Sequence, residues 1–147
     1  MSYVETHILG IPQTLYSLKR GMQAALDFSE PLGEIAEDVY RVIGQNFSSQ
    51  GRRGGGSWAM VSEEWARRKH NPLILHETLH LKRSVTSGNP HITSTKLEME
   101  TDVSYAHIHQ FGGNGIPARP FIRFIESDLK RWHDILHEHL LAAMRGV

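Results

Sequence analysis

The chain has 147 residues, of which 39% are hydrophobic, and this length fits one domain with a modest core. Sixteen Lys and Arg residues balance sixteen Asp and Glu residues, so the overall charge favours neither nucleic acid nor an anionic membrane as a partner. The absence of cysteine excludes disulfides, thiolate zinc sites and cysteine nucleophiles. Because no apolar run approaches the roughly 20 residues that span a bilayer, we expect a soluble, cytosolically made protein.

An extended segment and two helices are expected first. Residues 3–9 alternate weakly, as in a short strand or an extended arm. From Pro12, apolar residues recur three or four positions apart, which predicts a helix. Ser29 is the expected N-cap of a second helix, and the short link at 27–30 predicts a helical hairpin. The apolar stripes of the two helices are Leu15, Leu18, Met22, Ala25 and Leu26, and then Ile35, Val39, Val42, Ile43 and Phe47.

Residues 51–57 contain four glycines and two arginines, Arg52 and Arg53. This composition does not pack, so we expect a flexible loop with solvated arginines. A phosphate-binding loop is disfavoured, because the segment lacks the Gly-Lys-Ser/Thr ending and does not follow a strand. Arg52 and Arg53 are therefore candidates for a basic loop that lines a channel. A small DNA-contacting module that uses them is an alternative.

The middle of the chain is expected to contain a short helix and then a β-hairpin. Ser62 is the expected start of the helix. Segments 85–87 and 91–101 have strand-like composition on either side of a turn at 87–90. Residues 96–103 alternate, which predicts a strand with one buried face. Its apolar side would be Leu97, Met99, Thr101 and Val103, and its polar side Lys96, Glu98, Glu100 and Asp102.

A long C-terminal helix is predicted, and we expect it to cover the sheet. Ser127 is its candidate N-cap with Asp128 in the first turn, and residues 127–145 would span roughly 28 Å. Its apolar stripe is Ile125, Leu129, Trp132, Leu136, Leu140 and Ala143. The expected architecture is α+β in a single domain over 1–147: a small antiparallel sheet, formed as a long hairpin, packed by N-terminal helices and a long C-terminal helix.

Residues 105–121 form the most informative stretch. Three glycines and two prolines exclude a continuous helix or a central strand, so we expect a shaped loop. We expect Arg119 to donate to carbonyls or to a carboxylate, because its planar fork suits fixing a loop. Of His107 and His109, one should be packed and the other exposed. The apolar residues, expected against the chain's own core or a neighbouring subunit, are Tyr105, Phe111, Ile116 and Phe121.

Residues 76–80 match the H-E-x-x-H pattern, in which two histidines on one helix bind zinc and the glutamate is a general base. Pro72 leaves little helix before the motif, and the candidates for a third ligand, Glu98 or Glu100, lie on the polar face of a predicted strand. With ten histidines in the chain, such pairs also arise by chance. A zinc metallopeptidase that uses His76, Glu77 and His80 is the alternative function.

A second group of histidines lies in the C-terminal helix. His133 and His137 could present two imidazoles on one helix face, with His139 nearby. A solvated face with adventitious metal binding explains them without a built site. We therefore expect no metal ion and no cofactor.

Several motifs occur in a recognisable order: Trp58, Ser62 and Lys69; Thr78-x-x-Leu81-x-x-Ser84-Val85; Tyr105-Ala-x-x-His109-Gln-Phe-Gly-Gly; and Ile116-Pro-Ala-Arg-Pro-Phe121. In combination they resemble the phage virion morphogenesis, or tail-completion, family of Mu-like and related tailed phages and prophages. The chain departs from the family where Leu79 replaces a common glycine. The signature residues are Tyr105, His109, Gln110, Phe111, Gly112, Pro117, Arg119, Pro120 and Phe121.

The resemblance implies a small α+β subunit that assembles, usually as a ring, at the head-proximal end of the tail. It implies a structural virion protein of the tail or neck, present in the host cytoplasm during assembly, and no catalysis. The expected partners are other copies of the chain, with a hexamer as one option, the tail tube protein, and head-completion or connector proteins. DNA would be passing cargo only, and no membrane would be contacted.

Overall fold

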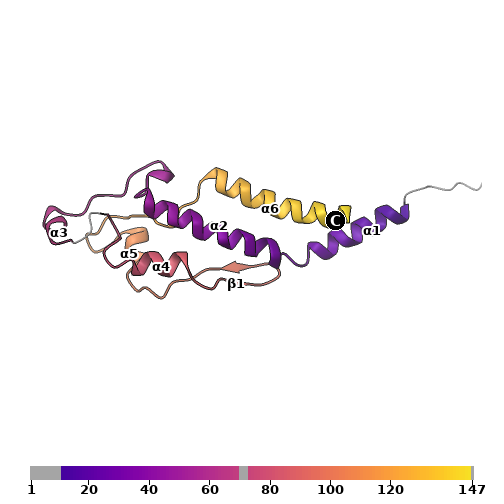
Figure 1. Cartoon of the computed structure of the whole chain (residues 1–147), viewed down its shortest axis with the longest axis horizontal. Helices are drawn as coiled ribbons and strands as arrows, with labels where there is room; N and C mark the ends of the chain where they lie inside the picture. Colours follow the sequence, from indigo (N-terminus) through magenta and orange to yellow (C-terminus); the bar gives the residue numbers. More distant parts are fainter. Residues whose placement is uncertain (1–10, 70–72, 147) are drawn as a thin grey trace, which may run out of the picture.

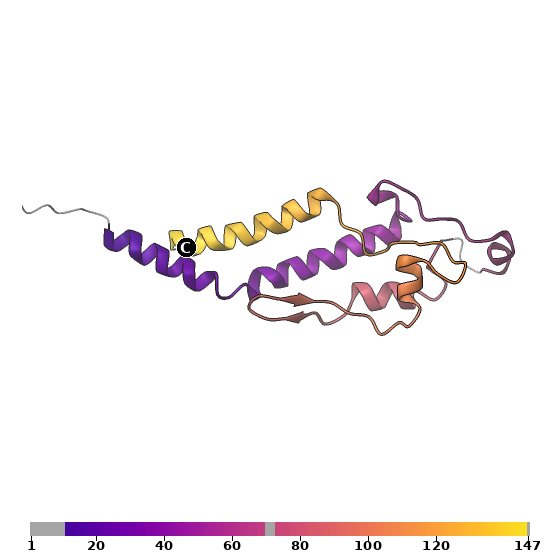
Figure 2. The ribbon, with the colours of Figure 1, turned by 180° about the vertical axis from the view of Figure 1, so that it is seen from behind.

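The computed structural model describes residues 11–69 and 73–146 and shows an elongated molecule built along one central helix (Figure 1). The expected segment at 3–9 lies outside the described residues. Helix α2 is central, with α6 along one side and α4 and the hairpin along the other (Figures 1 and 2). The elements are α1 (Ile11–Ala24), α2 (Ser29–Ser48), η1 (Arg52–Gly54), α3 (Glu63–Arg68), α4 (His80–Thr86), β1 (His91–Ile92), β2 (Leu97–Glu98), α5 (Ala106–Phe111) and α6 (Glu126–Arg145).

The core is organised around the predicted stripe of α2. All five predicted residues are buried, with at most 7% of their surface exposed. Phe47 is fully buried, and its ring meets those of Trp58 and Phe121 at centroid distances of 5.5 and 5.6 Å. Leu81 and Val85 of α4 complete this side of the core. The central helix therefore holds together segments that are far apart in the sequence.

The predicted hairpin between the first two helices is wrong. Helix α1 continues beyond the end of α2 and packs on the C-terminal end of α6 (Figures 1 and 2). There, Arg20 donates from Nη2 to the carbonyl of Met144 at 3.2 Å. Ser29 is the first residue of α2 and not its N-cap; Asp27 Oδ1 instead accepts from the Ser29 backbone N–H at 2.9 Å. Because α1 does not fold back along α2, its predicted apolar stripe remains exposed.

The glycine-rich segment packs more closely than its composition indicates. Gly51 is buried at φ 84°, and a Cβ there would lie 2.5 Å from Trp58 Cδ1. Arg53 forms an ion pair with Asp128 and donates from Nε to Gln45 at 3.1 Å. The expectation of two solvated arginines is therefore wrong for Arg53 and correct for Arg52, which is exposed. Flexibility of the segment and its place in a channel stay predictions.

The antiparallel hairpin exists but is shorter and lies later in the chain than predicted. β1 pairs with β2 in the register His91 to Glu98 and Ile92 to Leu97, so the turn lies at 93–96 and not at 87–90. Residues 85–86, predicted as strand, end helix α4. The alternation predicted for 96–103 is confirmed, because its apolar positions are more buried than its polar ones along the whole segment. The predicted strand is confirmed only at Leu97–Glu98, because residues 99–103 lie outside any strand. The α+β class with a small antiparallel sheet is therefore confirmed.

Helix α6 starts slightly earlier than predicted, and its N-terminus is fixed by an acid. Ser127 lies inside the helix, while Asp128 Oδ2 accepts from the Ile125 backbone N–H at 3.0 Å. Leu129, assigned to the apolar stripe, is 56% exposed. Helix α2 lies between α6 and the hairpin, so it is α2 that covers the sheet directly (Figure 1). Among the described residues, no helix is both long and apolar enough to cross a bilayer.

Candidate functional site

The 105–121 segment consists of a short helix followed by a fixed loop. Helix α5 takes up the first residues, so the expectation of a loop throughout is wrong for this part. A tight turn follows, in which Gly113 and Ile116 exchange two backbone hydrogen bonds of 3.0 and 2.8 Å. Asn114 and Gly115 have φ values of 52° and 75°, as the two central residues of a type I′ turn require. The glycines thus permit a reversal directly after a helix.

Gly112 joins α5 to this turn in a conformation that side chains rarely adopt. Its φ is 80° and its ψ is 171°, a region that is populated almost only by glycine. A Cβ at this position would also lie 3.0 Å from the Ala118 nitrogen and 3.2 Å from the Ile116 oxygen. Both the backbone angle and the close approach of the returning chain therefore require glycine here.

Gln110 ties α5 to the end of the segment. Its Oε1 accepts from the backbone N–H groups of Phe121 and Ile122, at 3.1 and 3.0 Å. Its Nε2 donates to the Ile122 carbonyl at 2.9 Å. One amide side chain therefore satisfies three backbone groups that no regular element would pair.

Arg119 fixes the loop to the segment before α3. Only 5% of this residue is exposed. Its guanidinium donates from Nε to the Ala59 carbonyl at 2.8 Å and from Nη2 to the Met60 carbonyl at 3.1 Å. Burial lowers the pKa of Arg119 from its ordinary value. The prediction that this arginine fixes a loop through carbonyls is confirmed.

Phe121 anchors the segment in the core, next to hydrogen bonds from Trp58 and from Asn46, a residue that sequence reasoning missed. Its side chain is 1% exposed. Asn46 Nδ2 donates to the carbonyls of Phe121 and Arg123, both at 2.9 Å, and Trp58 Nε1 donates to the Pro120 carbonyl at 3.0 Å. An asparagine beside the apolar stripe of a helix was the available signal, because a buried amide needs a partner.

Of the four residues of the segment that we expected to pack against apolar surface, Phe121 enters the core and the other three are exposed. Phe111 is 78% exposed, Tyr105 40% and Ile116 38%. His109 is half-buried with its ring edge-on to Tyr105, while His107 is exposed, so the expectation of one packed and one exposed histidine is confirmed. Burial, and then the charge of Arg119, lower the pKa of His109. The signature thus divides into residues that fix the loop and residues that the loop displays.

An apolar groove lies beside the displayed residues. It has a volume of about 540 Å³ between the segment before α3, the start of the 73–77 stretch, and the 115–119 turn. Met60 and Trp65 on its border are 79% and 50% exposed. Ile116 lines the same groove. We call Met60, Trp65 and Ile116, together with the exposed Phe111 of the signature segment, the apical surface.

The H-E-x-x-H pattern does not form a zinc-binding helix. Helix α4 begins at His80, and Leu79 before it has a φ of 57°, so His76 lies outside the helix. The buried His76 ring packs edge-on against Phe47, with Nδ1 2.9 Å from the Ile74 oxygen. Thr78 Oγ1 accepts from the His80 backbone N–H at 3.3 Å. The motif therefore starts a helix and supplies core packing.

The histidines of α6 are also accounted for without a built site. The rings of His133 and His137 stack on the exposed face with their centroids 5.9 Å apart, and His139 Nε2 lies 3.0 Å from the backbone carbonyl oxygen of Asp27. Within residues 11–69 and 73–146, no three His, Asp or Glu side chains are grouped so that they could hold a metal ion.

The fold and this segment define a small α+β protein in which a polar network fixes a surface loop. The model of the phage virion morphogenesis family matches residues 10–141. The chain belongs to this family, and its role is a structural one in phage morphogenesis, as a virion-associated protein. Comparison with curated proteins and with solved structures gives no significant match.

Proposed function

We propose that this protein completes or terminates the phage tail at its head-proximal end and thereby allows the head to join the tail. In this proposal it forms a homo-oligomeric ring, with a hexamer as one option, between the tail tube protein and the head-completion or connector proteins. DNA passes through as cargo. The exposed Arg52 is the candidate for a channel-facing cation, whereas Arg53 is engaged by Asp128.

The observation that carries the proposal is the contrast within the signature segment. Gln110, Arg119 and Phe121 are satisfied inside the chain, whereas Phe111 and Ile116 are exposed. Ile116 lines the same groove as Met60 and Trp65. A rigid loop that displays aromatic and apolar side chains loses little entropy when it binds, which is typical of a protein interface. In a phage morphogenesis protein, another virion subunit is the natural partner of such a surface.

Purified protein and purified tail tubes test the proposal directly. Light scattering and pelleting should show that the wild-type protein binds tube ends, and that Phe111→Ser together with Trp65→Ser weakens binding by about tenfold or more. Leu129→Ser, at an exposed leucine on α6 away from the apical surface, is the matched control and should bind normally. A wild-type protein that never binds tubes would count against the proposal.

A further inference from the structure

Helix α1 presents an apolar face that no other described part of its own chain covers. Within Ile11–Ala24, Leu15, Leu18 and Met22 recur at helical spacing, and their exposed fractions are 60%, 48% and 70%. Tyr16 is 61% exposed, and Leu26, directly after the helix, is 73% exposed. Because α1 continues past the body of the molecule, this face is accessible from outside (Figures 1 and 2). An apolar face of this extent is typical of an interaction site.

The charged residues of α1 are all basic. The helix contains Lys19 and Arg20 and no acidic residue. Lys19 is exposed, while Arg20 lies over the Tyr16 ring and donates to a carbonyl. Neither cation forms an ion pair with a residue that the structure describes. A partner for this helix should therefore combine apolar surface with carboxylates.

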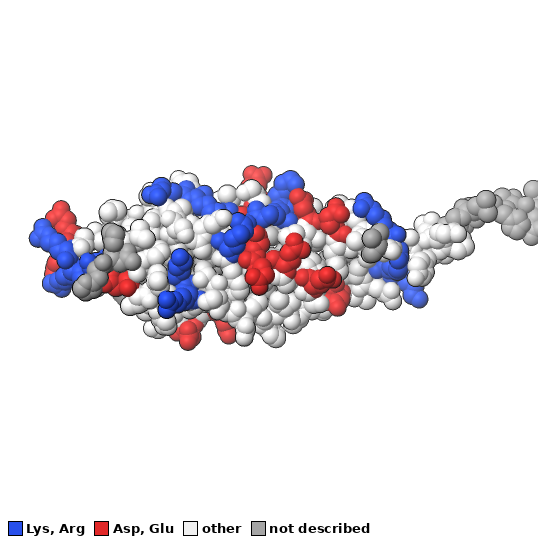
Figure 3. Space-filling view, in the orientation of Figure 1, with Lys and Arg blue, Asp and Glu red and all other residues white. Residues whose placement is uncertain are grey.

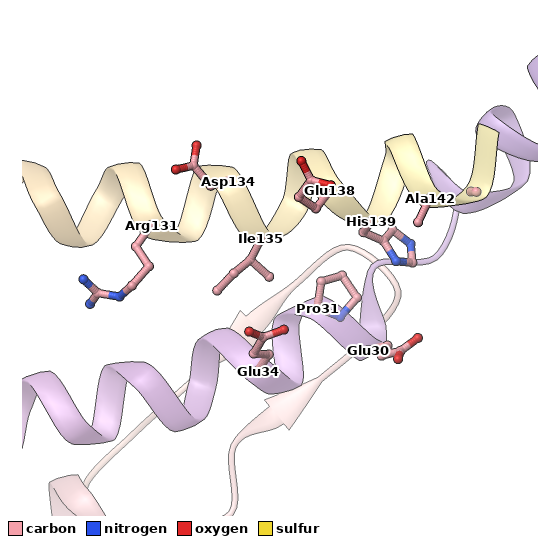
Figure 4. Close-up of a pocket in the computed structure, with 10 residues that line it drawn as sticks. Glu30, Pro31, Glu34, Arg131, Asp134, Ile135, Glu138, His139 and Ala142 are labelled. Atoms are coloured by element: carbon pink, nitrogen blue, oxygen red, sulfur yellow. The ribbon is translucent and has the colours of Figure 1, made fainter. Parts of the chain in front are cut away.

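The same molecule carries such a surface in the groove between α2 and α6. This groove has a volume of about 710 Å³, and Pro31 and Ile135 point into it (Figure 4). Acidic side chains gather where the two helices run side by side (Figure 3). Arg131 is held by Asp38 and Asp128, and Lys130 pairs with Asp134. This leaves Glu30, Glu34 and Glu138 without an ion pair to any described residue. The acidic residues of the groove are Glu30, Glu34, Asp134 and Glu138, and further apolar lining comes from Ala142 and Ala143.

The dimensions of the two surfaces agree. Helix α1 has 14 residues and is roughly 21 Å long, whereas the groove runs along α6 from Arg131 to Ala143, or roughly 18 Å. Within one chain they do not meet face to face, because the inner side of α1 is engaged at the end of α6, where Gly21 lies against Met144. Two complementary surfaces at different places on one molecule can pair only between copies, head to tail.

We propose that the exposed face of α1 docks into the α2–α6 groove of a neighbouring copy of this chain, with the exposed Lys19 facing Glu30, Glu34 and Glu138. The occupant of the groove is thus a second copy. The contact is heterologous, so repetition produces a closed ring or an open filament. This inference rests on the proposed function, in which the protein assembles with itself, and names the surfaces that would do so.

Two variants separate the two halves of the contact. The donor variant, Leu18→Glu with Met22→Glu, changes only α1, and the acceptor variant, Glu34→Lys with Glu138→Lys, changes only the groove. The replaced side chains are exposed, so circular dichroism and urea unfolding should match the wild type. Sedimentation velocity should show each variant alone as a monomer, with self-association weakened by about a hundredfold.

Controls at exposed sites outside the contact are Leu129→Glu and Lys96→Glu, which should assemble normally.

A mixture of the two variants gives the sharpest result. Each retains one intact surface, so an equal mixture should form a two-chain species and nothing larger. Wild-type assembly that persists in both variants, or fails in only one of them, would overturn this pairing and leave the proposed function standing. A wild-type protein that is monomeric at every concentration, even on tail tubes, would overturn the pairing and the ring together. Binding of that monomer to tube ends would still support the tail-end role.

Discussion

At the scale of single residues, the signature of this chain consists largely of backbone support. Arg119, Gln110 and Asn46 bond to carbonyls and N–H groups of segments that no helix or sheet satisfies. A buried polar backbone group without a partner costs about 1–3 kcal/mol, so each of these side chains stabilises a loop that would otherwise be unfavourable. The glycines and prolines of residues 105–121 indicate a shaped loop, whereas the hydrogen-bond partners of these three side chains depend on the fold.

Replacement of Arg119 by lysine tests this role. A lysine ammonium cannot reach both carbonyls with the geometry of the guanidinium, so we expect a loss of about 1–3 kcal/mol in the free energy of unfolding, measured with urea. Arg52→Lys, at an exposed arginine, is the control and should be near neutral. If Arg119→Lys left both stability and tail-tube binding unchanged, the loop would not depend on this fork.

Asp128 predicts how stability depends on pH. Its carboxylate is fully buried; burial alone would raise its pKa, but hydrogen bonds from Arg53, the Ile125 backbone and Arg131 lower the pKa from 3.8 to about 2. Because the folded pKa is lowered, the stabilisation is fully present above pH 4 and is lost as pH falls towards 2. It amounts to about 2 kcal/mol.

Unfolding free energies measured between pH 2 and pH 6 should therefore show this loss in the wild-type protein. Asp128→Asn should be less stable at neutral pH and should have a flatter profile below pH 4. Asp134→Asn is the matched control, because Asp134 is exposed and its ion pairs among the described residues are those with Lys130 and His133. Equal flattening in both variants would contradict the assignment to Asp128.

At the scale of elements, a helix or strand was predicted correctly where the local sequence pattern agreed with the tertiary contacts. The stripe of α2 and the alternation at 96–103 were predictable, because burial follows the periodicity. The helical state of residues 85–86 was not predictable. Leu81 and Val85 lie four positions apart and both pack into the core as part of helix α4, and this packing outweighs the β-propensity of the segment. Likewise, a stripe in α1 predicts an amphipathic helix, and says nothing of whether its partner is in the same chain.

The fixed loop itself was partly predictable. Glycine and proline spacing indicated chain reversal, and the fork of Arg119 indicated carbonyl partners. Its partners Ala59 and Met60, 60 and 59 residues away in sequence, could not be identified, because no local pattern encodes a contact at that separation. The ion pair of Arg53 with Asp128 was missed for the same reason.

Gly112 allows a test of the turn as an element. Gly112→Ala adds a Cβ at 3.0 Å from the Ala118 nitrogen in a backbone conformation that disfavours side chains, so we expect a loss of about 1–3 kcal/mol in unfolding free energy. Gly56→Ala is the control, because a Cβ there would meet nothing within 4 Å and its φ is ordinary. A melting temperature unchanged by Gly112→Ala would show that the turn rearranges freely.

At the scale of the whole molecule, the elongated shape separates three surfaces. The apical surface lies at the end that bears α3, α1 projects at the other end, and the α2–α6 groove lies between them (Figure 1). In our account, the groove and α1 join neighbouring copies, while the apical surface binds another virion subunit. Because the surfaces are separate, a mutation can disrupt one of these contacts and leave the others intact.

Electron microscopy of particles assembled without this protein tests whether it completes the tail for joining to the head. We expect filled heads beside separate tails that are unjoined or overlong, and restoration of joined particles when the wild-type protein is supplied. Supply of Leu129→Ser should restore them equally, whereas Phe111→Ser with Trp65→Ser should not. Normally joined particles in the absence of the protein would contradict the account.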